Sequence, residues 1–131
     1  MIYLDTSVAL AHLLSEDRVP PASLWQQTLV SSRLIEYEVW TQLHGRGLGR
    51  SHGEAAQALI GRIGLAELAP PVLARALEAF PGRARVRTLD ALHLATCTFL
   101  SDTGQTVHLA SYDSGMNETA AAMGIALHAD L

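Results

Sequence analysis

Short apolar runs alternate along the chain with longer stretches in which apolar residues return once per helical turn. The short runs are typical of buried β-strands, and the longer stretches are typical of helices that bury one face. Because helical stretches rather than tight turns separate the short runs, the strands are expected to lie mostly parallel. The five predicted strands span residues 2–4, 28–31, 64–68, 106–111 and 125–128.

Capping residues, glycines and prolines mark the ends of the predicted helices. A hydroxyl residue at position 6 or 7 can cap the first helix, which reaches residue 15, and Thr88 can cap a helix over residues 89–100. Ser51 and Glu54 have the spacing of a capping box, and Gly64 closes that helix. The other predicted helices open at the proline pair 20–21 or cover residues 33–46, 72–80 and 115–123.

These elements predict one α/β domain over residues 1–131, a mostly parallel sheet of about five strands with helices on both faces. Hydrophobic residues make up 49% of the chain and charged residues 17%, so intrinsic disorder is excluded. No apolar stretch approaches the ~18 residues of a membrane-spanning helix, and we expect no signal peptide. Since Cys97 is the one cysteine, no internal disulfide forms, and a cytoplasmic location is expected.

The charge balance limits how the protein can bind nucleic acid. Its 13 acidic residues outnumber nine basic residues, all of them arginine, which gives a formal net charge of −4. A broad cationic surface that grips a long nucleic acid requires many basic side chains, so that mode of binding is disfavoured. A small nucleic-acid site that receives its positive charge from bound metal ions remains open.

Two aspartates follow predicted strands at the edge of the sheet where ligands bind. Asp5 follows the first strand and Asp113 the fourth, and ligands of open α/β sheets bind at the carboxyl ends of strands. The alternative is that each aspartate only caps the helix that follows it. Because Thr6, Ser7 and Ser114 can cap those helices equally well, both aspartates are left free for chemistry.

A glutamate on the predicted helix 33–46 is a third candidate. Glu38 lies inside the apolar arc of that helix, whereas Glu36 lies at the edge of the arc. A carboxylate that points inward is costly unless it is paired or bound to metal. Glu38 is therefore favoured over Glu36 as the functional acid, and an ion pair with an arginine is the alternative.

Asp90 lies in the first turn of a predicted helix, where acids are common because they complement the helix dipole. It also shares a line with Leu94 and Cys97, so it tops an apolar stripe rather than a solvated face. This position is compatible with a site shared with the two aspartates at the strand ends. His93 is expected to be a satisfied, half-buried histidine, with orientation of Asp90 as the alternative.

Two arginine-containing loops are candidates for contact with the phosphates of a ligand. Arg83, Arg85 and Arg87 alternate just before the predicted helix 89–100, and Arg46 lies in a glycine-rich loop. Such side chains can steer phosphates toward a site. The alternative is that they are ordinary solvated loop charges.

Four motifs in this order carry a resemblance to a known family. They are Asp5-Thr6-Ser7, Ser32-x-Leu34-x-x-x-Glu38, Leu89-Asp90-Ala91-Leu92-His93-Leu94-Ala95 and Ser111-Tyr112-Asp113. Together they resemble the PIN-domain nucleases, most closely the VapC type of toxin ribonuclease. The resemblance implies a metal-binding cluster of acids with two polar residues in support. The implied acids are Asp5, Glu38, Asp90 and Asp113, and the implied supporting residues are Thr6 and Ser111.

The resemblance also implies an activity, a cofactor and partners. Four converging carboxylates repel one another, and oxygen-only ligands suit Mg²⁺ or Mn²⁺, which relieve that repulsion. The implied activity is endoribonuclease cleavage of RNA that leaves a 5′-phosphate and a 3′-hydroxyl. The implied partners are a small antitoxin protein, whose arginine can occupy the acidic site, and a second copy in a homodimer. The alternative is a degenerate PIN-like domain that binds protein or RNA without catalysis.

Overall fold

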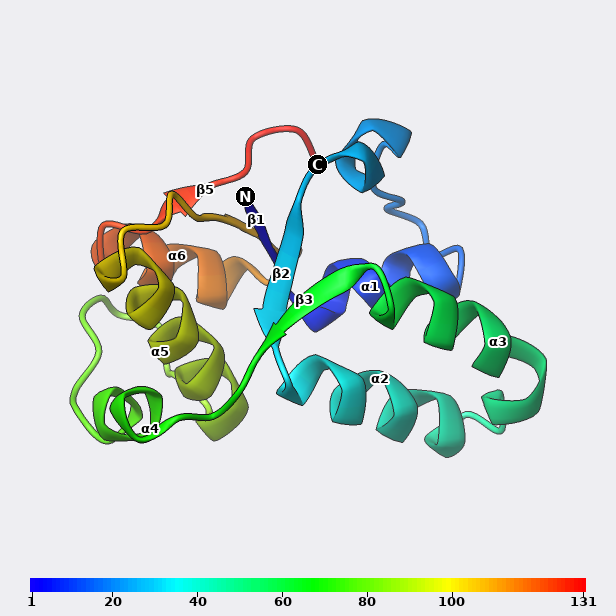
Figure 1. Ribbon diagram of the computed structural model, residues 1–131, viewed down its shortest axis with the longest axis horizontal. Helices are drawn as coiled ribbons and strands as arrows, with labels where there is room; N and C mark the ends of the chain where they lie inside the picture. Colours follow the sequence, from blue (N-terminus) through cyan, green and yellow to red (C-terminus); the bar gives the residue numbers. More distant parts are fainter.

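Five short parallel strands form the centre of the protein. The computed structural model describes all of residues 1–131 and orders the strands β3-β2-β1-β4-β5 (Figure 1). Every neighbouring pair is parallel, as the alternation of strands and helices predicts. The strands are β1 (Ile2–Leu4), β2 (Leu29–Ser32), β3 (Ile63–Ala66), β4 (His108–Ala110) and β5 (Ala126–Leu127).

The order of the strands reverses at β1. From β1 the chain moves outward through β2 to β3, then returns to place β4 and β5 on the other side of β1. In open α/β sheets, this reversal leaves a crevice at the carboxyl ends of the two strands that flank it. Asp5 directly follows β1, and Asp113 follows β4 after two residues, so the fold brings these two aspartates to the same crevice.

Helices cover both faces of the sheet. In Figure 1, α1, α2 and α3 lie to the right of the strands, and α4, α5 and α6 lie to the left. A short 3₁₀ helix, η1, connects α1 to β2. None of the helices combines the length and the apolar character needed to cross a membrane. The helices are α1 (Thr6–Leu13), η1 (Ala22–Gln26), α2 (Leu34–Gly45), α3 (Gly49–Ile60), α4 (Pro70–Ala76), α5 (Thr88–Asp102) and α6 (Ser114–Ala122).

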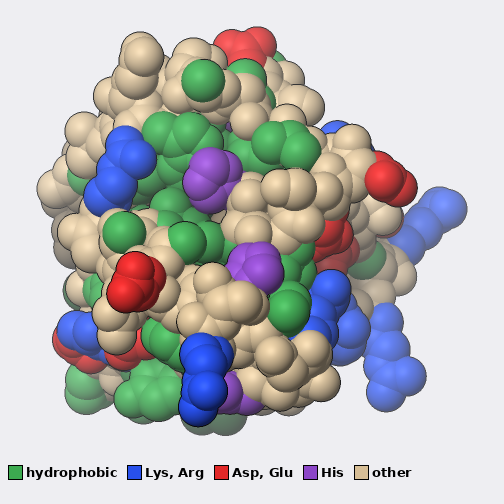
Figure 2. Space-filling model, turned by 90° about the vertical axis from the view of Figure 1, so that its right-hand side faces the viewer, with side chains coloured by type: hydrophobic (Ala, Val, Ile, Leu, Met, Phe, Trp, Pro, Cys, Tyr) green, Lys and Arg blue, Asp and Glu red, His purple; other side chains and the backbone are tan.

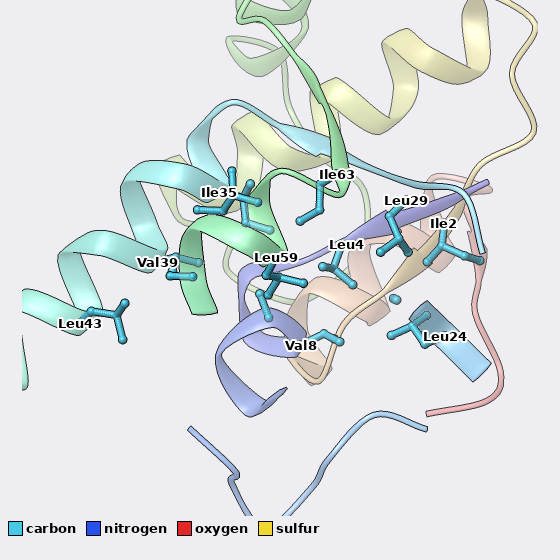
Figure 3. Close-up of a cluster of buried hydrophobic side chains, with 14 residues drawn as sticks. Ile2, Leu4, Val8, Leu24, Leu29, Ile35, Val39, Leu43, Leu59 and Ile63 are labelled. Carbon is cyan, nitrogen blue, oxygen red and sulfur yellow. The ribbon is translucent and has the colours of Figure 1, made fainter. Parts of the chain in front are cut away.

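The core has two parts because side chains alternate along β1. Ile2 and Leu4 face the larger cluster, and Tyr3 faces the smaller one. Figure 3 shows the larger cluster, in which side chains from β1 and β2 meet apolar positions of the helices on that face. The smaller cluster joins Tyr3 to Leu94 and Cys97 of α5 and to Met116 of α6. The central strand β1 is thus buried on both faces, in agreement with the predicted helices on both sides of the sheet.

Aromatic rings and histidines pack together at the end of the molecule formed by η1 and the helices α1 to α3. His12 lies with its ring centroid 4.5 Å from that of Trp25, and His44 stacks on Trp40 at 5.4 Å. Figure 2 shows histidines among hydrophobic side chains in the middle of the face on this side. Burial and the nearby Arg62 lower the pKa of His12, which favours the neutral ring in this surrounding.

Several predicted helix ends are wrong. Helix α3 begins at Gly49 after Leu48, and Ser51 lies inside its first turn, where its Oγ donates to the Leu48 carbonyl at 3.3 Å. The predicted capping box of Ser51 and Glu54 therefore does not form. The helix stops at Ile60, and Gly64 lies in β3, where it pairs with Val30 of β2. Pairing between the strands thus overrides the local glycine signal.

The elements rich in proline also differ from the prediction. The helix expected after the prolines at positions 20 and 21 is only the 3₁₀ helix η1. Helix α4 begins at Pro70 rather than at residue 72, because both prolines fit the first turn of a helix. It ends at Ala76, short of the predicted residue 80. Thr88 is the first residue of α5 rather than its cap, since Arg87 holds the cap position without a side-chain cap bond.

Candidate functional site

The four predicted acids line one hollow at the carboxyl ends of β1 and β4. The hollow has a volume of about 390 Å³, and residues of α1, α2, α5 and the start of α6 form its wall. Thr6 and Arg87 also line it. The fold therefore brings together side chains that are far apart in the sequence: Asp5, Glu38, Asp90 and Asp113.

Asp5 is nearly buried and is held by two serines. Its Oδ2 accepts hydrogen bonds from Ser7 Oγ at 2.6 Å and from Ser111 Oγ at 2.8 Å. The backbone N–H of Asp5 donates to the Ala110 carbonyl at 3.0 Å, which ties the end of β1 to the end of β4. Although Asp5 occupies the cap position of α1, its side chain makes no cap hydrogen bond. The carboxylate is thus not used as a helix cap.

Asp113 caps α6 and also reaches the hollow. Its Oδ1 accepts from the backbone N–H of Met116 at 3.0 Å, so the expectation that Ser114 does the capping is wrong. Ser114 is already the first residue of the helix. The backbone N–H of Asp113 donates to Ser111 Oγ at 3.0 Å, so Ser111 contacts both aspartates. Oδ1 of Asp113 caps the helix, and the other oxygen, Oδ2, takes no part in the cap.

Glu38 projects from α2 and is held by two residues from other elements. Its Oε1 accepts a hydrogen bond from Thr6 Oγ1 at 2.9 Å and lies 2.5 Å from His93 Nε2. Arginine does not pair with Glu38, so the alternative of an ion pair is wrong. Glu36 instead contacts Arg33 on the outer side of the helix at 3.8 Å. The helical periodicity correctly distinguished the two glutamates.

The burial and the contacts of His93 differ from those expected from the sequence. It is fully buried rather than half-buried, and it contacts Glu38 rather than Asp90. Its other ring nitrogen, Nδ1, lies 2.7 Å from Tyr3 OH. Neither this contact nor the role of Ser7 could be derived from the motifs, because spacing along a helix does not reveal partners on a neighbouring strand or helix.

Three of the four acids share one arrangement, in which one carboxylate oxygen is held and the other accepts no hydrogen bond from the protein. Asp5 is held through Oδ2, Glu38 through Oε1 and Asp113 through Oδ1. The fixed oxygen sets the orientation of each carboxylate. The second oxygen of each is then left as a ligand donor for a cation.

Asp90 differs because the guanidinium of Arg87 contacts its carboxylate in place of a hydroxyl or a backbone N–H. Burial raises the pKa of Asp90, and the neighbouring charges of Asp113 and Asp5 raise it further, although Arg87 acts in the opposite direction. Like charges that disfavour ionisation in this way show that the acids interact electrostatically. A cation in the hollow would relieve that repulsion.

Arg87 supplies the one positive charge that reaches these acids. Its Nε lies 3.5 Å from Asp90 Oδ2, and its Nη2 lies 3.5 Å from Asp113 Oδ2. The guanidinium therefore spans two of the four carboxylates. Its side chain is nonetheless 76% exposed, so it can leave this position without unfolding its surroundings.

The other predicted RNA contacts lie farther from the acids. Arg46 lines a second hollow that shares Ser7 and Gln42 with the first. Arg83 and Arg85 are exposed and line neither hollow. Arg87 is thus the only member of the predicted arginine set within the acidic hollow.

The donor set suits a hard divalent cation, but the side chains do not yet surround one. The acids offer only carboxylate oxygens, which Mg²⁺ and Mn²⁺ prefer. However, no group of three or more His, Cys, Asp or Glu side chains is arranged to hold an ion. The Arg87 guanidinium already places positive charge between Asp90 and Asp113. The chemistry of the donor set therefore fits a divalent ion, whereas the positions of the carboxylates do not yet form a binding site for one.

Comparison with known proteins agrees with the fold and with the sequence motifs. A crystal structure of Mycobacterium tuberculosis VapC20, a sarcin-ricin loop cleaving toxin, is similar with a TM-score of 0.69 and 20% sequence identity. The match covers 89% of this chain and 93% of that chain. No curated protein matches the chain in sequence. The sequence model of the PIN domain matches residues 2–122, and the chain therefore belongs to the PIN domain family.

Proposed function

We propose that the protein is an endoribonuclease that hydrolyses RNA phosphodiester bonds with Mg²⁺ or Mn²⁺, and that it acts as the toxin of a toxin–antitoxin pair. The observation that carries the proposal is the convergence of four carboxylates, from four separate elements, on one hollow where the strand order reverses. Membership of the PIN domain family supports it. So does the similarity to VapC20, which is described as a sarcin-ricin loop cleaving toxin.

Four residues would hold the metal: Asp5, Glu38, Asp90 and Asp113. A bound divalent ion supplies a water of lowered pKa as nucleophile and charge to stabilise the leaving oxygen. Ser7 and Ser111 orient Asp5, while Thr6 donates to Glu38. These hydrogen bonds fix the carboxylates before the substrate arrives.

Arg87 would have two roles in this mechanism. In the structure it pairs with Asp90 and Asp113. Because its side chain is largely exposed, it could instead bind a phosphate group of RNA at the rim of the hollow when the carboxylates hold a divalent ion. Since the chain carries a formal net charge of −4, such a local contact contributes more to RNA binding than the overall charge does.

The antitoxin and the homodimer belong to the same proposal. Arg87 demonstrates that a guanidinium fits between Asp90 and Asp113, so an arginine of a small antitoxin can occupy the same position and block the metal. A second copy of the chain would bind through apolar positions of the early helices, among them the exposed Tyr37 of α2. A molar mass of one chain in solution, by light scattering, would refute the homodimer.

The experiment that tests the activity compares cleavage of total RNA and of a synthetic sarcin–ricin loop hairpin. The purified protein should cleave with Mg²⁺ and lose activity with EDTA. Asp5→Asn and Asp113→Asn should abolish cleavage while leaving the fold intact, because an asparagine oxygen can still accept the hydrogen bonds from Ser7, Ser111 and Met116.

Two glutamates on one helix provide a matched control. Glu38→Gln should abolish cleavage, whereas Glu36→Gln should leave it unchanged, because Glu36 contacts only Arg33 on the outer side of α2. Undiminished cleavage by Asp5→Asn or by Asp113→Asn would remove the proposed mechanism. A folded wild-type protein that binds RNA but never cleaves it would indicate a binding module instead.

A further inference from the structure

Behind Glu38, a chain of buried hydrogen bonds runs through the smaller cluster of the core. The backbone N–H of Ser32 donates to Tyr3 OH at 3.1 Å, Tyr3 OH lies 2.7 Å from His93 Nδ1, and His93 Nε2 lies 2.5 Å from Glu38 Oε1. The side chains come from β1, α5 and α2. Tyr3 is 0% exposed and His93 is 1% exposed, so water does not compete for the two contacts of Tyr3, and the chain reaches the hollow only at Glu38.

The proton positions in this chain follow from the number of donors. A tyrosine hydroxyl has one proton, and Tyr3 OH already accepts from the Ser32 N–H. The Glu38 carboxylate can only accept, so His93 Nε2 carries a proton and donates it to Oε1. In a neutral His93 the other ring nitrogen, Nδ1, then accepts the proton of Tyr3 OH. Burial also raises the pKa of Tyr3 well above its ordinary value, which keeps this hydroxyl protonated.

The donation from His93 orients Glu38. A glutamate on the face of a helix has three rotatable bonds, and its carboxylate samples many positions unless contacts restrict it. His93 and Thr6 both donate to Oε1, so the carboxylate cannot rotate without losing two hydrogen bonds. Oε2 accepts no hydrogen bond from the protein, and Glu38 lines the hollow.

We propose that Tyr3 and His93 are positioning residues, which hold the Glu38 carboxylate so that its second oxygen is presented to the metal. Tyr3 acts by donating to Nδ1 of His93, and His93 acts by fixing Glu38. The inference rests on the proposed function, in which Glu38 is a metal ligand. It adds two residues, neither of them lining the hollow, whose effect on the metal passes through Glu38 alone.

The test uses two substitutions of similar size at position 93. In His93→Gln, the amide nitrogen takes about the place of Nε2 and can still donate to Glu38. In His93→Asn, the shorter side chain reaches only the place of Nδ1 and leaves Glu38 without this donor. Replacing a residue that orients a ligand typically weakens metal affinity about 10- to 100-fold. We therefore expect weaker Mn²⁺ binding in His93→Asn by that factor, and binding within about threefold of wild type in His93→Gln, as titrated by calorimetry.

A double-mutant comparison separates positioning from general damage to the core. In the Glu38→Gln background, His93→Asn should have no further effect on Mn²⁺ affinity, because the residue through which it acts is gone. The melting temperatures of His93→Asn and His93→Gln should be similar, since both leave a comparable volume unfilled. Equal Mn²⁺ affinities for the two variants, or a loss that persists in the Glu38→Gln background, would overturn the inference.

A spectroscopic readout tests the hydrogen-bond chain without metal. Nitrogen-15 NMR of the wild-type protein should find His93 protonated on Nε2, and Tyr3→Phe should shift the Nδ1 resonance, because Nδ1 loses its hydrogen bond while the ring at position 3 stays in the core. A proton on Nδ1 in the wild type would contradict the chain, whatever the activity. Tyr3→Phe also replaces the position 93 variants if these do not fold, and it should then weaken Mn²⁺ binding.

The outcomes also distinguish this inference from the proposed function. If Asp5→Asn and Glu38→Gln lose cleavage but His93→Asn binds Mn²⁺ as the wild type does, only the positioning inference fails. If the wild-type protein binds no Mn²⁺ and Asp5→Asn has no effect on cleavage, the proposed function fails and the inference fails with it.

Discussion

Replacing Arg87 with glutamine is expected to tighten the binding of Mn²⁺. In the metal-free protein the Arg87 guanidinium lies 3.5 Å from both Asp90 Oδ2 and Asp113 Oδ2. A divalent ion that binds these oxygens must first displace the guanidinium. The free energy of the two contacts is therefore subtracted from the free energy of metal binding in the wild type, and it is not subtracted in Arg87→Gln.

The size of the effect follows from the exposure of the pair. Exposed ion pairs contribute about 0.2–1 kcal/mol each, and the Arg87 side chain is 76% exposed. The two carboxylates are less exposed, at 21% for Asp90 and 32% for Asp113. We therefore take the middle of the range for two such ion pairs together, about 1 kcal/mol. That free energy corresponds to an approximately fivefold lower Kd for Mn²⁺.

The assay is a calorimetric titration of the purified protein with Mn²⁺ at low and high salt. Arg85→Gln is the matched control. It removes the same charge two residues before Arg87, but the Arg85 side chain does not line the hollow. The difference between the two variants should shrink at high salt, since salt screens exposed charges. Equal Kd values for Arg87→Gln and Arg85→Gln would refute the idea that Arg87 competes with metal.

Three further predictions concern stability. Burial and neighbouring acids raise the pKa of Asp90 in the folded state. Between the ordinary and the raised pKa, the folded state therefore binds more protons than the unfolded state. The free energy of unfolding falls as pH rises through that window. Asp90→Asn should therefore raise the melting temperature at neutral pH in EDTA but not below the ordinary pKa, and a lower melting temperature at neutral pH would contradict this. Gly124→Ala should lower the free energy of unfolding by about 1–2 kcal/mol, since Gly124 has φ +80°. Gly45→Ala, with open space around it at the end of α2, should raise it by about 0.5 kcal/mol. Denaturant unfolding that gave both changes the same sign would exclude this reasoning. Leu43→Ala in the core should lower stability by about 2–5 kcal/mol. Leu77→Ala, at a side chain that is 89% exposed, should change stability by less than about 0.5 kcal/mol. Comparable losses from the two substitutions would show that burial does not decide the loss of stability.

The sheet and the individual candidate acids could be predicted from regularities that are visible along the chain, whereas their grouping into one site was implied by the resemblance to the PIN-domain nucleases. Buried parallel strands are short and apolar, and the crevice between β1 and β4 follows once their order is known. The choice of Glu38 over Glu36 likewise needed only the period of the helix. Each of these inferences uses spacing along the chain and no knowledge of a specific neighbour.

What the sequence did not reveal depends on contacts between elements. Ser51 is a good capping residue, yet α3 starts two residues earlier, because local signals of this kind compete with packing against the rest of the fold. His93 is three residues from Asp90 in sequence, but the face of α5 that carries it turns toward Glu38 and Tyr3. The contact of Arg87 with two acids at once depends on the relative position of α5 and α6.

Four successive residues, the three of β1 and Asp5 directly after it, serve three different tasks. Ile2 and Leu4 fill the larger cluster, Tyr3 donates a hydrogen bond to His93, and Asp5 lines the hollow. Because neighbouring side chains of a strand point to opposite faces, inserting or deleting one residue here would exchange all of these tasks. Length variation at this point would thus remove core packing and catalysis together, and no compensating substitution at a single site could restore both.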